Sequence, residues 1–453
     1  MSKTLIIVEA PSKAAHIQKF LGPNFIVKAS IGHITEMPIP SKMTTEEKQK
    51  YSEYAQEVNN GFNPLFKVSA DKKKVVAELK RILKTVDECI LATDSDAEGA
   101  AIAYHLLQEL QPKVPTFRAT WNEITDKAVR EGLKNKKLIN VAKQEPKDFF
   151  GQAESAITRA QWDRLYGYGS TSYIWRAVKS GTSSGRVQTP GTLLVVEREE
   201  KRLAFVSVSF YTIWGDFEGT KAKLTEFNGK KIADGSKIDD EGLVKDGYTL
   251  ITDENLSEIL SELKEKDYAI SDVSSKPYRR VPPAPFTTST ALQSIGAKTR
   301  QSVKQITKYF QELYSSDAAV TYIRTVSVVS APEAIAEARK EITRLFGAKF
   351  IPGSPRVYTD KKSGNSGHEC LRPVLDDNSG KIVNPKFEDP KKQQIFDLIR
   401  LRFLASQSID CEGLTWTAKI DATDANARFS ASETEIHEPG WTTIYQLDEE
   451  VGA

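Results

Sequence analysis

The chain has 453 residues, of which 39% are hydrophobic and 27% are charged, and its formal net charge is +2. This length predicts two to four domains rather than one core, and the composition is that of a soluble globular protein. No apolar run approaches the roughly 20 residues that cross a bilayer, which argues against a membrane protein. With so little net charge, any nucleic-acid surface must come from local patches.

The cysteine pattern and the N-terminus indicate the cellular compartment. Cys89, Cys370 and Cys411 are far apart and form no Cys-x-x-Cys pair. This argues against a disulfide framework and against a zinc module, and it fits a reducing cytoplasm. The N-terminus has a short apolar run, residues 5–8, followed at once by Glu9, which is typical of a buried strand and not of a signal peptide. We therefore expect a cytoplasmic protein.

Residues 1–146 alternate between strand and helix patterns. "TLIIVEA" (4–10) predicts a strand, and the segment after it has a helical pattern. "DECILATDSDAEG" (87–99) predicts a strand that runs into an acidic turn, followed by a helix over 100–110. Strand, turn and helix in this order predict an α/β domain with a parallel sheet over 1–146, with a polar insertion at about 34–66.

The rest of the chain predicts a helical and a β region. Helical patterns cover 147–206, and alternation typical of strands begins at 207. A Pro-rich stretch at 280–292 opens a unit with helical segments at 302–314, 331–347 and 389–407, after which alternation returns. We predict a helical domain at 147–206, a discontinuous β domain at 207–279 and 409–453, and a mostly helical inserted domain at 280–408.

The acidic turn carries Asp94, Asp96 and Glu98 at alternate positions, and Glu9 ends another predicted strand. The carboxyl ends of parallel strands are where α/β sites gather, and oxygen ligands favour Mg²⁺. The alternative interpretation is that these acids lie at the N-terminus of a helix, where each stabilises the helix through its dipole by ~0.3–1 kcal/mol. Lys13 follows Glu9 by four residues and is expected near the same face.

The stretch "VTYIRTVS" (320–327) is rich in β-branched residues and predicts an extended, strand-like segment. Alternation along a strand places Tyr322 and Arg324 on one face. A surface strand with one packed aromatic side chain is the simpler interpretation. The other is a phenol that attacks a phosphate, with a cation beside it to hold the charge.

Together these segments resemble the type IA DNA topoisomerases. The further motifs that carry the resemblance, in chain order, are "GHITEMP" (32–38), "FRATWNEIT" (117–125), "RAQWDRLYGY" (159–168), "SSGRVQTPGTLLVVERE" (183–199), "PPAPFTTSTALQ" (282–293), "GHECLRP" (367–373), "RLRFLASQS" (400–408) and "HEPGWTTIY" (437–445). An ordered series over almost the whole chain is far more specific than a single motif. The resemblance implies a toroid with a Toprim α/β domain, a helical DNA-groove domain, a β arch and an inserted domain that carries the tyrosine.

The resemblance implies transient cleavage of one DNA strand, strand passage and religation, which relaxes negatively supercoiled DNA without ATP. Tyr322 stands where the family carries the nucleophile, which forms a 5′-phosphotyrosine link. Arg324 and Lys13 would stabilise the developing charge, and Glu9 would protonate the leaving 3′-oxygen. His368 would contact the DNA backbone, although outside its motif it would be read as a packed or loop histidine.

The other implied residues bind metal and DNA. Mg²⁺ would be held by Asp94, Asp96, Glu98 and Glu9. Contacts to single-stranded DNA would come from Arg159, Asp163, Arg186, Gln188 and Arg118. Tyr166 and Tyr168 would stack on bases or pack in the core, and a structural role competes for Arg118 and Glu123. The implied substrate is a single-stranded region of negatively supercoiled DNA, and we expect a monomer, nucleoid-associated if bacterial.

The sequence departs from the family pattern at three positions: Ala97 replaces an arginine, Ala100 a glutamate and Val326 an aspartate. Slower chemistry or altered metal dependence is expected. The segment that usually follows the "PGW…Y" motif is missing, as are zinc-ribbon tails. Three alternatives are open: a minimal or divergent form, a separate chain that completes the core, or a truncated core. The alternative function is a cleavage-impaired, single-stranded-DNA-binding relative with a structural or regulatory role. A different Toprim enzyme, such as a primase or a nuclease, is a third interpretation, but it would leave Tyr322 unexplained. Reverse gyrase is disfavoured because the sequence has no P-loop signature.

Overall fold

The computed structural model describes residues 2–360, 368–424 and 426–445. These residues form two compact units. The first unit comprises the described residues within 1–186, 282–409 and 441–453, and the second comprises those within 187–281 and 410–440. The mixed class that the sequence predicts, α/β together with helical and β parts, is confirmed. None of the helices in the described ranges has the length and apolar composition that a bilayer crossing needs.

A five-stranded sheet in the order β2-β1-β5-β6-β7 is the centre of the first unit, and only the edge strand β7 is antiparallel. The strands are β1 (Thr4–Val8), β2 (Phe25–Ala29), β5 (Glu88–Leu91), β6 (Thr116–Arg118) and β7 (Lys137–Leu138). All of β1 is buried, as expected for a parallel strand with helices on both faces. Both carboxyl ends that carry the predicted acids, those of β1 and β5, therefore open at the same edge.

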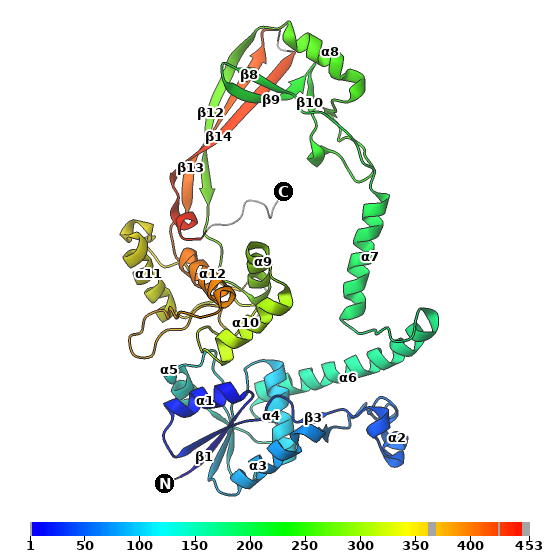
Figure 1. Ribbon diagram of the computed structural model, residues 1–453, viewed down its shortest axis with the longest axis vertical. Helices are drawn as coiled ribbons and strands as arrows, with labels where there is room; N and C mark the ends of the chain where they lie inside the picture. Colours follow the sequence, from blue (N-terminus) through cyan, green and yellow to red (C-terminus); the bar gives the residue numbers. More distant parts are fainter. Residues whose placement is uncertain (1, 361–367, 425, 446–453) are drawn as a thin grey trace. The chain divides into compact units, whose positions relative to one another are not determined.

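Helices cover the sheet on both sides (Figure 1). They are α1 (Pro11–Phe20), α3 (Lys73–Leu83), α4 (Ala97–Leu110) and α5 (Asp126–Lys134). Leu5, Ile7 and Leu91 share one core with the apolar faces of α3 and α4, whereas α1 and α5 contact each other on the opposite side. Because α4 starts directly after the acidic turn, its buried face fixes the position of that turn.

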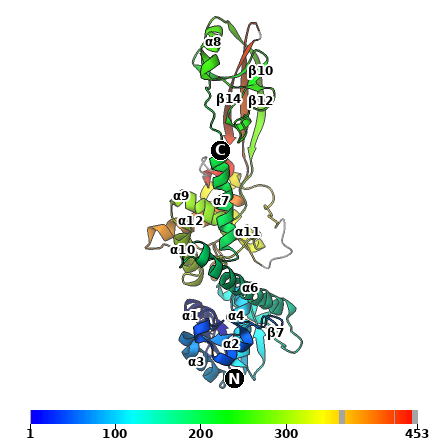
Figure 2. The ribbon, with the colours of Figure 1, turned by 90° about the vertical axis from the view of Figure 1, so that its right-hand side faces the viewer.

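Helix α6 (Lys147–Ala177) packs its first turns against α4 and buries Phe149, Phe150 and Ala153 (Figure 2). Beside it lies a small substructure made of the pair β3 (Thr35–Glu36) and β4 (Lys67–Val68) and of α2 (Thr45–Tyr51). Met37, Met43 and Ala55 form its core, and Ala160 of α6 packs against that core. The helix thus connects the substructure to the sheet domain.

The remaining part of the first unit is mostly helical. Its helices are α9 (Thr288–Thr299), α10 (Val303–Ser315), α11 (Pro332–Phe346) and α12 (Pro390–Ser406), with a short helical turn at Ala348–Phe350. The last three correspond to the helical segments that the sequence predicts. Helix α12 is central, since Ile395, Phe396 and Ile399 are fully buried and it contacts the other three helices.

The second unit contains a sheet in the order β11-β10-β9-β14-β13-β12, with β8 paired to β9. The strands are β8 (Trp214–Phe217), β9 (Thr220–Phe227), β10 (Lys230–Ile232), β11 (Tyr248–Thr249), β12 (Tyr268–Arg280), β13 (Cys411–Ala422) and β14 (Ala427–Glu438). Helix α8 (Asp253–Lys264) packs Ile259 and Leu263 on this sheet (Figures 1 and 2). The unit also includes α7 (Gln188–Ala204). Strands that lie far apart in the chain thus share one sheet.

Candidate active site

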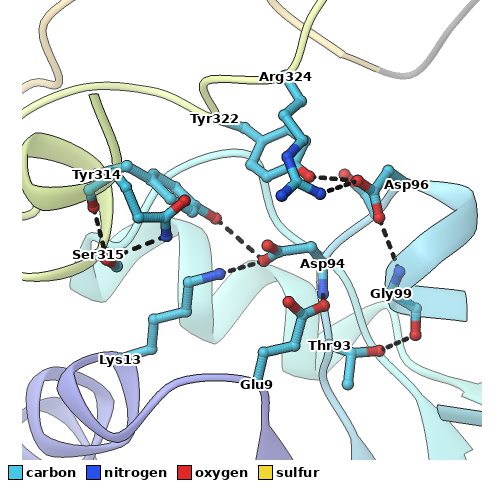
Figure 3. A network of polar contacts seen from close by, with 12 residues as sticks. Glu9, Lys13, Thr93, Asp94, Asp96, Gly99, Tyr314, Ser315, Tyr322 and Arg324 are labelled. Atoms are coloured by element: carbon cyan, nitrogen blue, oxygen red, sulfur yellow. Dashed lines mark hydrogen bonds and ion pairs between the residues drawn. The ribbon is translucent and has the colours of Figure 1, made fainter. Parts of the chain in front are cut away.

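The acids at the ends of β1 and β5 meet because the two strands are parallel neighbours, with Ile7 opposite Leu91. The backbone N–H of Asp94 donates a hydrogen bond to Oε1 of Glu9 at 2.9 Å. Lys13, which is buried on α1, forms an ion pair with Asp94 (Figure 3). Two carboxyl groups and one ammonium group therefore lie together at this edge of the sheet.

The turn between β5 and α4 is held by short-range contacts. Asp96 caps α4, since its Oδ1 accepts a hydrogen bond from the N–H of Gly99 at 2.7 Å, and the hydroxyl of Thr93 donates to the carbonyl of Gly99 at 2.6 Å. A Cβ atom on Gly99 would lie 2.3 Å from the carbonyl oxygen of Asp94, so this position has no space for a side chain. The turn thus needs glycine here.

Arg118, at the end of β6, lies underneath the turn and is 7% exposed. Its guanidinium group donates to the carbonyl oxygens of Leu91, Thr93, Asp94 and Ala119 at 2.6–3.0 Å. A buried guanidinium group with its donors used in this way stabilises the backbone of the turn. The structure thus favours the structural role that the sequence leaves open for Arg118, and not a contact with DNA.

Tyr322 reaches the acidic turn from the helical part of the same unit. The prediction of a strand over 320–327 is wrong: Val320 forms only an isolated bridge with Pro373, and the N–H of Tyr322 donates to the carbonyl of Asn122 at 2.8 Å. The phenol donates to Oδ2 of Asp96 at 2.5 Å, and Nη1 of Arg324 lies 3.4 Å from the same oxygen (Figure 3). Tyrosine and arginine thus point to one carboxylate.

Two further rings enclose the phenol. The ring of Tyr314 meets that of Tyr322 edge to face at 5.3 Å, and the imidazole of His368 stacks on it at 5.6 Å with 26° between the planes. The Nζ atom of Lys13 lies 4.5 Å from the centre of the Tyr314 ring. The Oγ atom of Ser95 lies 3.3 Å from Nδ1 of His368. These contacts hold the nucleophile candidate in one orientation.

The pKa values in the site differ according to burial and charge. Burial, and next the negative charge of Asp94, raise the pKa of Glu9 to about 7. Burial and the same negative charge hold the pKa of the Tyr322 phenol well above its usual range. For Asp96, burial works in the opposite direction, but hydrogen bonds from Tyr322 and Gly99 and the charge of Arg324 lower its pKa. Glu9 therefore retains a proton near neutral pH.

Glu98 points to a neighbouring pocket of about 470 Å³ that extends along α6. Its oxygens contact Nε2 of His33 at 2.6 Å and the guanidinium group of Arg159. Asp163, which also lines this pocket, accepts a hydrogen bond from Nε of Arg186 at 2.7 Å. The structure thus brings three of the predicted DNA-binding residues to the vicinity of the acidic turn, whereas Gln188 opens α7 in the second unit.

The four predicted metal ligands are not assembled at one point. In the part of the chain that the structure describes, no three histidine, cysteine or acidic side chains form a metal-binding group. Glu9 and Asp94 are adjacent, but Asp96 is bonded to the phenol and Glu98 to His33 and Arg159. One or two carboxylates, with water and phosphate oxygens, are enough for Mg²⁺, so the Glu9–Asp94 pair fits this ion.

The three departures from the family pattern lie in different surroundings. Ala97 is the first residue of α4, Ala100 is fully buried in that helix, and Val326 is 74% exposed. The sequence did not single out Ser95, Tyr314 or His33 as site residues. His33 lies in the "GHITEMP" motif, so this motif was a usable signal, whereas the roles of Ser95 and Tyr314 depend on contacts with residues far away in the chain.

Comparisons with known proteins agree with this geometry. The sequence model of the family described as "DNA topoisomerase" matches residues 147–452, and that of the "Toprim domain" matches residues 4–124. DNA topoisomerase 1 of Streptomyces coelicolor is 36% identical over 98% of this chain and 47% of its own length. DNA topoisomerase 1 of Mycolicibacterium smegmatis is 34% identical over 99% of this chain and 49% of its own length. Full-length topoisomerase I from Thermotoga maritima superposes with a TM-score of 0.76 at 27% identity, covering 99% of this chain and 68% of its own.

The chain therefore belongs to the type IA DNA topoisomerase family. It spans about half the length of the curated relatives that it matches. The Toprim domain is a metal-binding domain in topoisomerases.

Proposed function

We propose that this chain cleaves one strand of DNA by attack of the Tyr322 oxygen on a backbone phosphorus atom, and later reseals the strand. A bond from the tyrosine oxygen to phosphorus forms and the bond from phosphorus to the 3′-oxygen breaks, which leaves a 5′-phosphotyrosine and a free 3′-hydroxyl. The phosphodiester energy is conserved in the new bond, so religation needs no ATP. The observation that carries the proposal is the phenol bonded to Asp96 beside Arg324.

Two protons move in the cleavage step. The phenol gives its proton to Asp96, which already accepts its hydrogen bond, and Glu9 gives a proton to the leaving 3′-oxygen. The pKa of the phenol is raised and that of Asp96 is lowered, so complete transfer of the proton before the attack is strongly unfavourable. The proton therefore moves only as the bond to phosphorus forms. Religation runs the same steps in reverse.

Two cationic side chains and one histidine are proposed to stabilise or contact the DNA backbone at the cut. The Arg324 side chain is 62% exposed, so its guanidinium group is free to turn from Asp96 to phosphate oxygens. Lys13 supplies a second positive charge next to Asp94. His368, held by Ser95 and stacked on Tyr322, is placed to contact the DNA backbone next to the cut.

The proposed metal ion is Mg²⁺, held by Asp94 and, once it has given up its proton, by Glu9. Asp96 and Glu98 would join only by leaving their present partners. When bound, the ion supplies positive charge that neutralises phosphate oxygens. The proposed DNA path follows the pocket lined by Arg159 and Asp163, with Arg186 bonded to Asp163. The proposed DNA contact Gln188 lies two residues after Arg186 in the chain. The substrate is a single-stranded region of negatively supercoiled DNA, bound by a monomer on the cytoplasmic nucleoid.

Covalent capture on a single-stranded oligonucleotide tests the proposal. The oligonucleotide is labelled at its 5′ end or, separately, at its 3′ end and incubated with the protein, with and without Mg²⁺, before a denaturing gel. Only the 3′-labelled fragment should become linked to the wild-type protein. Tyr322→Phe should abolish the link, whereas Tyr309→Phe, at a partly buried contact with Asp389 outside the site, should retain it.

The alternative function predicts a different result. If the wild-type protein binds the oligonucleotide and links to neither fragment, the chain is a cleavage-impaired, single-stranded-DNA-binding relative. Capture that survives Tyr322→Phe would show that another residue is the nucleophile.

We also propose that a further segment, on this chain or on a separate one, packs on α7. Leu193, Leu194 and Val195 are 54–69% exposed on this helix, and the relatives are about twice as long as the part that matches. Adding the region that follows the matched part of the Streptomyces coelicolor relative should slow proteolysis within α7. Unchanged cleavage at α7 would contradict this.

A further inference from the structure

Helix α3 concentrates positive charge on the face that it turns to solvent. The segment from Ala70 to Lys84 contains six basic and two acidic side chains and thus has a net charge of +4, although the whole chain has a net charge of only +2. One face of the helix packs Val76, Leu79 and Ile82 into the core of the sheet domain. The exposed residues of α3 and its C-cap include five basic ones: Lys73, Lys74, Lys80, Arg81 and Lys84.

Most of these cations are not neutralised within the protein. Glu78, the one acid on α3, pairs with Lys28 at 2.7 Å, and Glu109 pairs with Lys80 at 2.7 Å. The other four cations of the face form no ion pair with any residue that the structure describes, and they are Lys73, Lys74, Arg81 and Lys84. The face therefore presents positive charge that an external anion can neutralise.

Helix stability does not account for this arrangement. Lys80 and Arg81 lie in the last turn of α3, where the helix dipole favours cations. Lys73 and Lys74 lie in the first turn, where the dipole favours acids, and that turn contains none. Because these two lysines are placed against the dipole, their contribution is expected to lie outside the helix.

The packing of α3 restricts the kind of partner. A basic amphipathic helix can lie on a membrane, but only by inserting its apolar face, and that face of α3 is already buried in the core. Surfaces that bind single-stranded DNA carry aromatic side chains on which bases stack. No residue between Phe66 and Tyr104 is aromatic. The face thus suits a polyanion that is bound through its phosphates alone.

We propose that the exposed face of α3 binds the phosphate backbone of duplex DNA. The 11 residues of the helix extend over about 16 Å, a length over which duplex DNA carries about nine phosphate charges. The chain belongs to a family of DNA topoisomerases, so duplex DNA next to the single-stranded substrate is the polyanion at hand. The contact carries no sequence information and adds affinity for the flanking duplex.

This surface is separate from the proposed single-strand path. None of the four unpaired cations lines the pocket that contains Arg159 and Asp163. In Figure 1, α3 lies at the opposite end of the first unit from α9 and α11. The proposal goes beyond strand cleavage and does not depend on the chemistry of Tyr322.

Fluorescence anisotropy of the whole chain with a labelled blunt duplex of about 24 base pairs tests the proposal. The α3 variant combines Lys73→Gln, Lys74→Gln, Arg81→Gln and Lys84→Gln, because glutamine keeps the helix propensity and removes the charge. The control variant combines Lys19→Gln, Lys304→Gln, Lys386→Gln and Lys391→Gln, at exposed lysines elsewhere in the first unit. The two variants have equal net charge, so a difference between them reports the α3 face.

At about 50 mM salt the wild-type chain should bind the duplex with a dissociation constant below about 10 μM, and the α3 variant should bind at least about ten-fold more weakly. The slope of the logarithm of the binding constant against the logarithm of the salt concentration should become shallower by about 3–4, since each lost phosphate contact removes about 0.9. The control variant and Tyr322→Phe should stay within about three-fold of wild type.

A single-stranded oligonucleotide of about eight nucleotides separates this proposal from the proposed function. The α3 variant should bind it, and become linked to it, as the wild-type chain does. Failure of the wild-type chain to form the link, together with the expected loss of duplex binding in the α3 variant, would contradict strand cleavage and leave the α3 surface standing.

Other results overturn the proposal. They are equal losses in the α3 and control variants, an equal loss on the short single strand, or no duplex binding by the wild-type chain at about 100 μM. Poly-glutamate that binds more tightly than the duplex, and only when the α3 face is intact, would assign the face to an acidic polypeptide instead. If the α3 variant does not fold, as judged by circular dichroism, Lys73→Gln with Lys74→Gln and Arg81→Gln with Lys84→Gln are tested as pairs, each with about half the change in slope.

Discussion

Glu9 and Asp94 are neighbouring carboxyl groups with different partners. Glu9 accepts one backbone hydrogen bond and is otherwise desolvated, whereas Asp94 has the ammonium group of Lys13 beside it. Burial disfavours the charged form of a carboxyl group, so the pKa of Glu9 rises to about 7. A group with this pKa is suited to give and take a proton at neutral pH, which is the role proposed for Glu9 at the 3′-oxygen.

The raised pKa of Glu9 predicts a pH-dependent stability. The unfolded chain releases the Glu9 proton at about pH 4.5 and the folded chain only at about pH 7. The free energy of unfolding therefore falls as pH rises through this window, by at most about 3 kcal/mol. Glu9→Gln has no carboxyl group to ionise at this position and lacks this loss. Its free energy of unfolding minus that of the wild type should therefore rise between about pH 4.5 and 7 and stay constant above about pH 7.

Urea unfolding of both proteins at pH 5, 6, 7 and 8 in magnesium-free buffer checks this. Glu46→Gln, in the exposed first turn of α2, serves as the control and should follow wild type at every pH. A stability difference between Glu9→Gln and wild type that does not change with pH would show that Glu9 ionises in the folded chain as it does in the unfolded one.

The turn between β5 and α4 is the element on which the proposed site depends. It presents Asp94 and Asp96 from one short segment, and it can do so because Gly99 lets the first turn of α4 approach the Asp94 backbone. The hydroxyl of Thr93 donates to the carbonyl of Gly99, and the guanidinium group of Arg118 donates to that of Asp94. The geometry of the acids thus follows from the backbone and not from their own side-chain contacts.

Gly99→Ala should therefore destabilise the protein by about 1–3 kcal/mol, because backbone atoms cannot move aside as a flexible side chain can. Gly151→Ala is the matched control: this exposed glycine lies within α6 with nothing near its Cβ position, and its replacement should stabilise by about 0.5–1 kcal/mol. Thermal unfolding of the two variants measures both effects. Equal behaviour of the two variants would contradict the close approach at Gly99.

In the whole molecule, the sheet domain and the tyrosine-bearing helical part meet within one unit. Arg372 is 2% exposed and forms ion pairs with Glu369 at 2.8 Å and with Glu123, from the sheet domain, at 3.2 Å. Burial raises the pKa of Glu123, while the charge of Arg372 opposes this. Asp377 accepts hydrogen bonds from the first N–H groups of α5. Strand passage, which the resemblance to the family implies, would require these contacts to separate.

Removal of the Arg372 side chain should be costly, since it leaves two partly buried carboxylates, those of Glu123 and Glu369, without their buried cation. We expect Arg372→Ala to lower the free energy of unfolding by about 3–5 kcal/mol. Lys28→Ala, which breaks an exposed ion pair with Glu78, should cost at most about 1 kcal/mol. Denaturant unfolding of the two variants makes the comparison. A small loss for Arg372→Ala would mean that the interface relaxes to admit water.

Much of the first unit was predictable because local patterns carry the information. The apolar run before Glu9 and the run before Asp94 each predict a strand end, and parallel pairing brings such ends together. The helical segments at 302–314, 331–347 and 389–407 were likewise visible in their periodicity. The strand prediction at 320–327 failed because the backbone there bonds to Asn122 and Arg372 and not to a neighbouring strand.

The side chains proposed to carry the chemistry, and the elements that present most of them, could be named from the sequence alone. Their partners could not: Tyr322 meets Asp96 across 226 residues of chain, Arg118 turns inward, and Glu98 pairs with His33 and Arg159. Periodicity and propensity act over a few residues, whereas ion pairs, hydrogen bonds and cavities depend on which distant surfaces the packed core brings together.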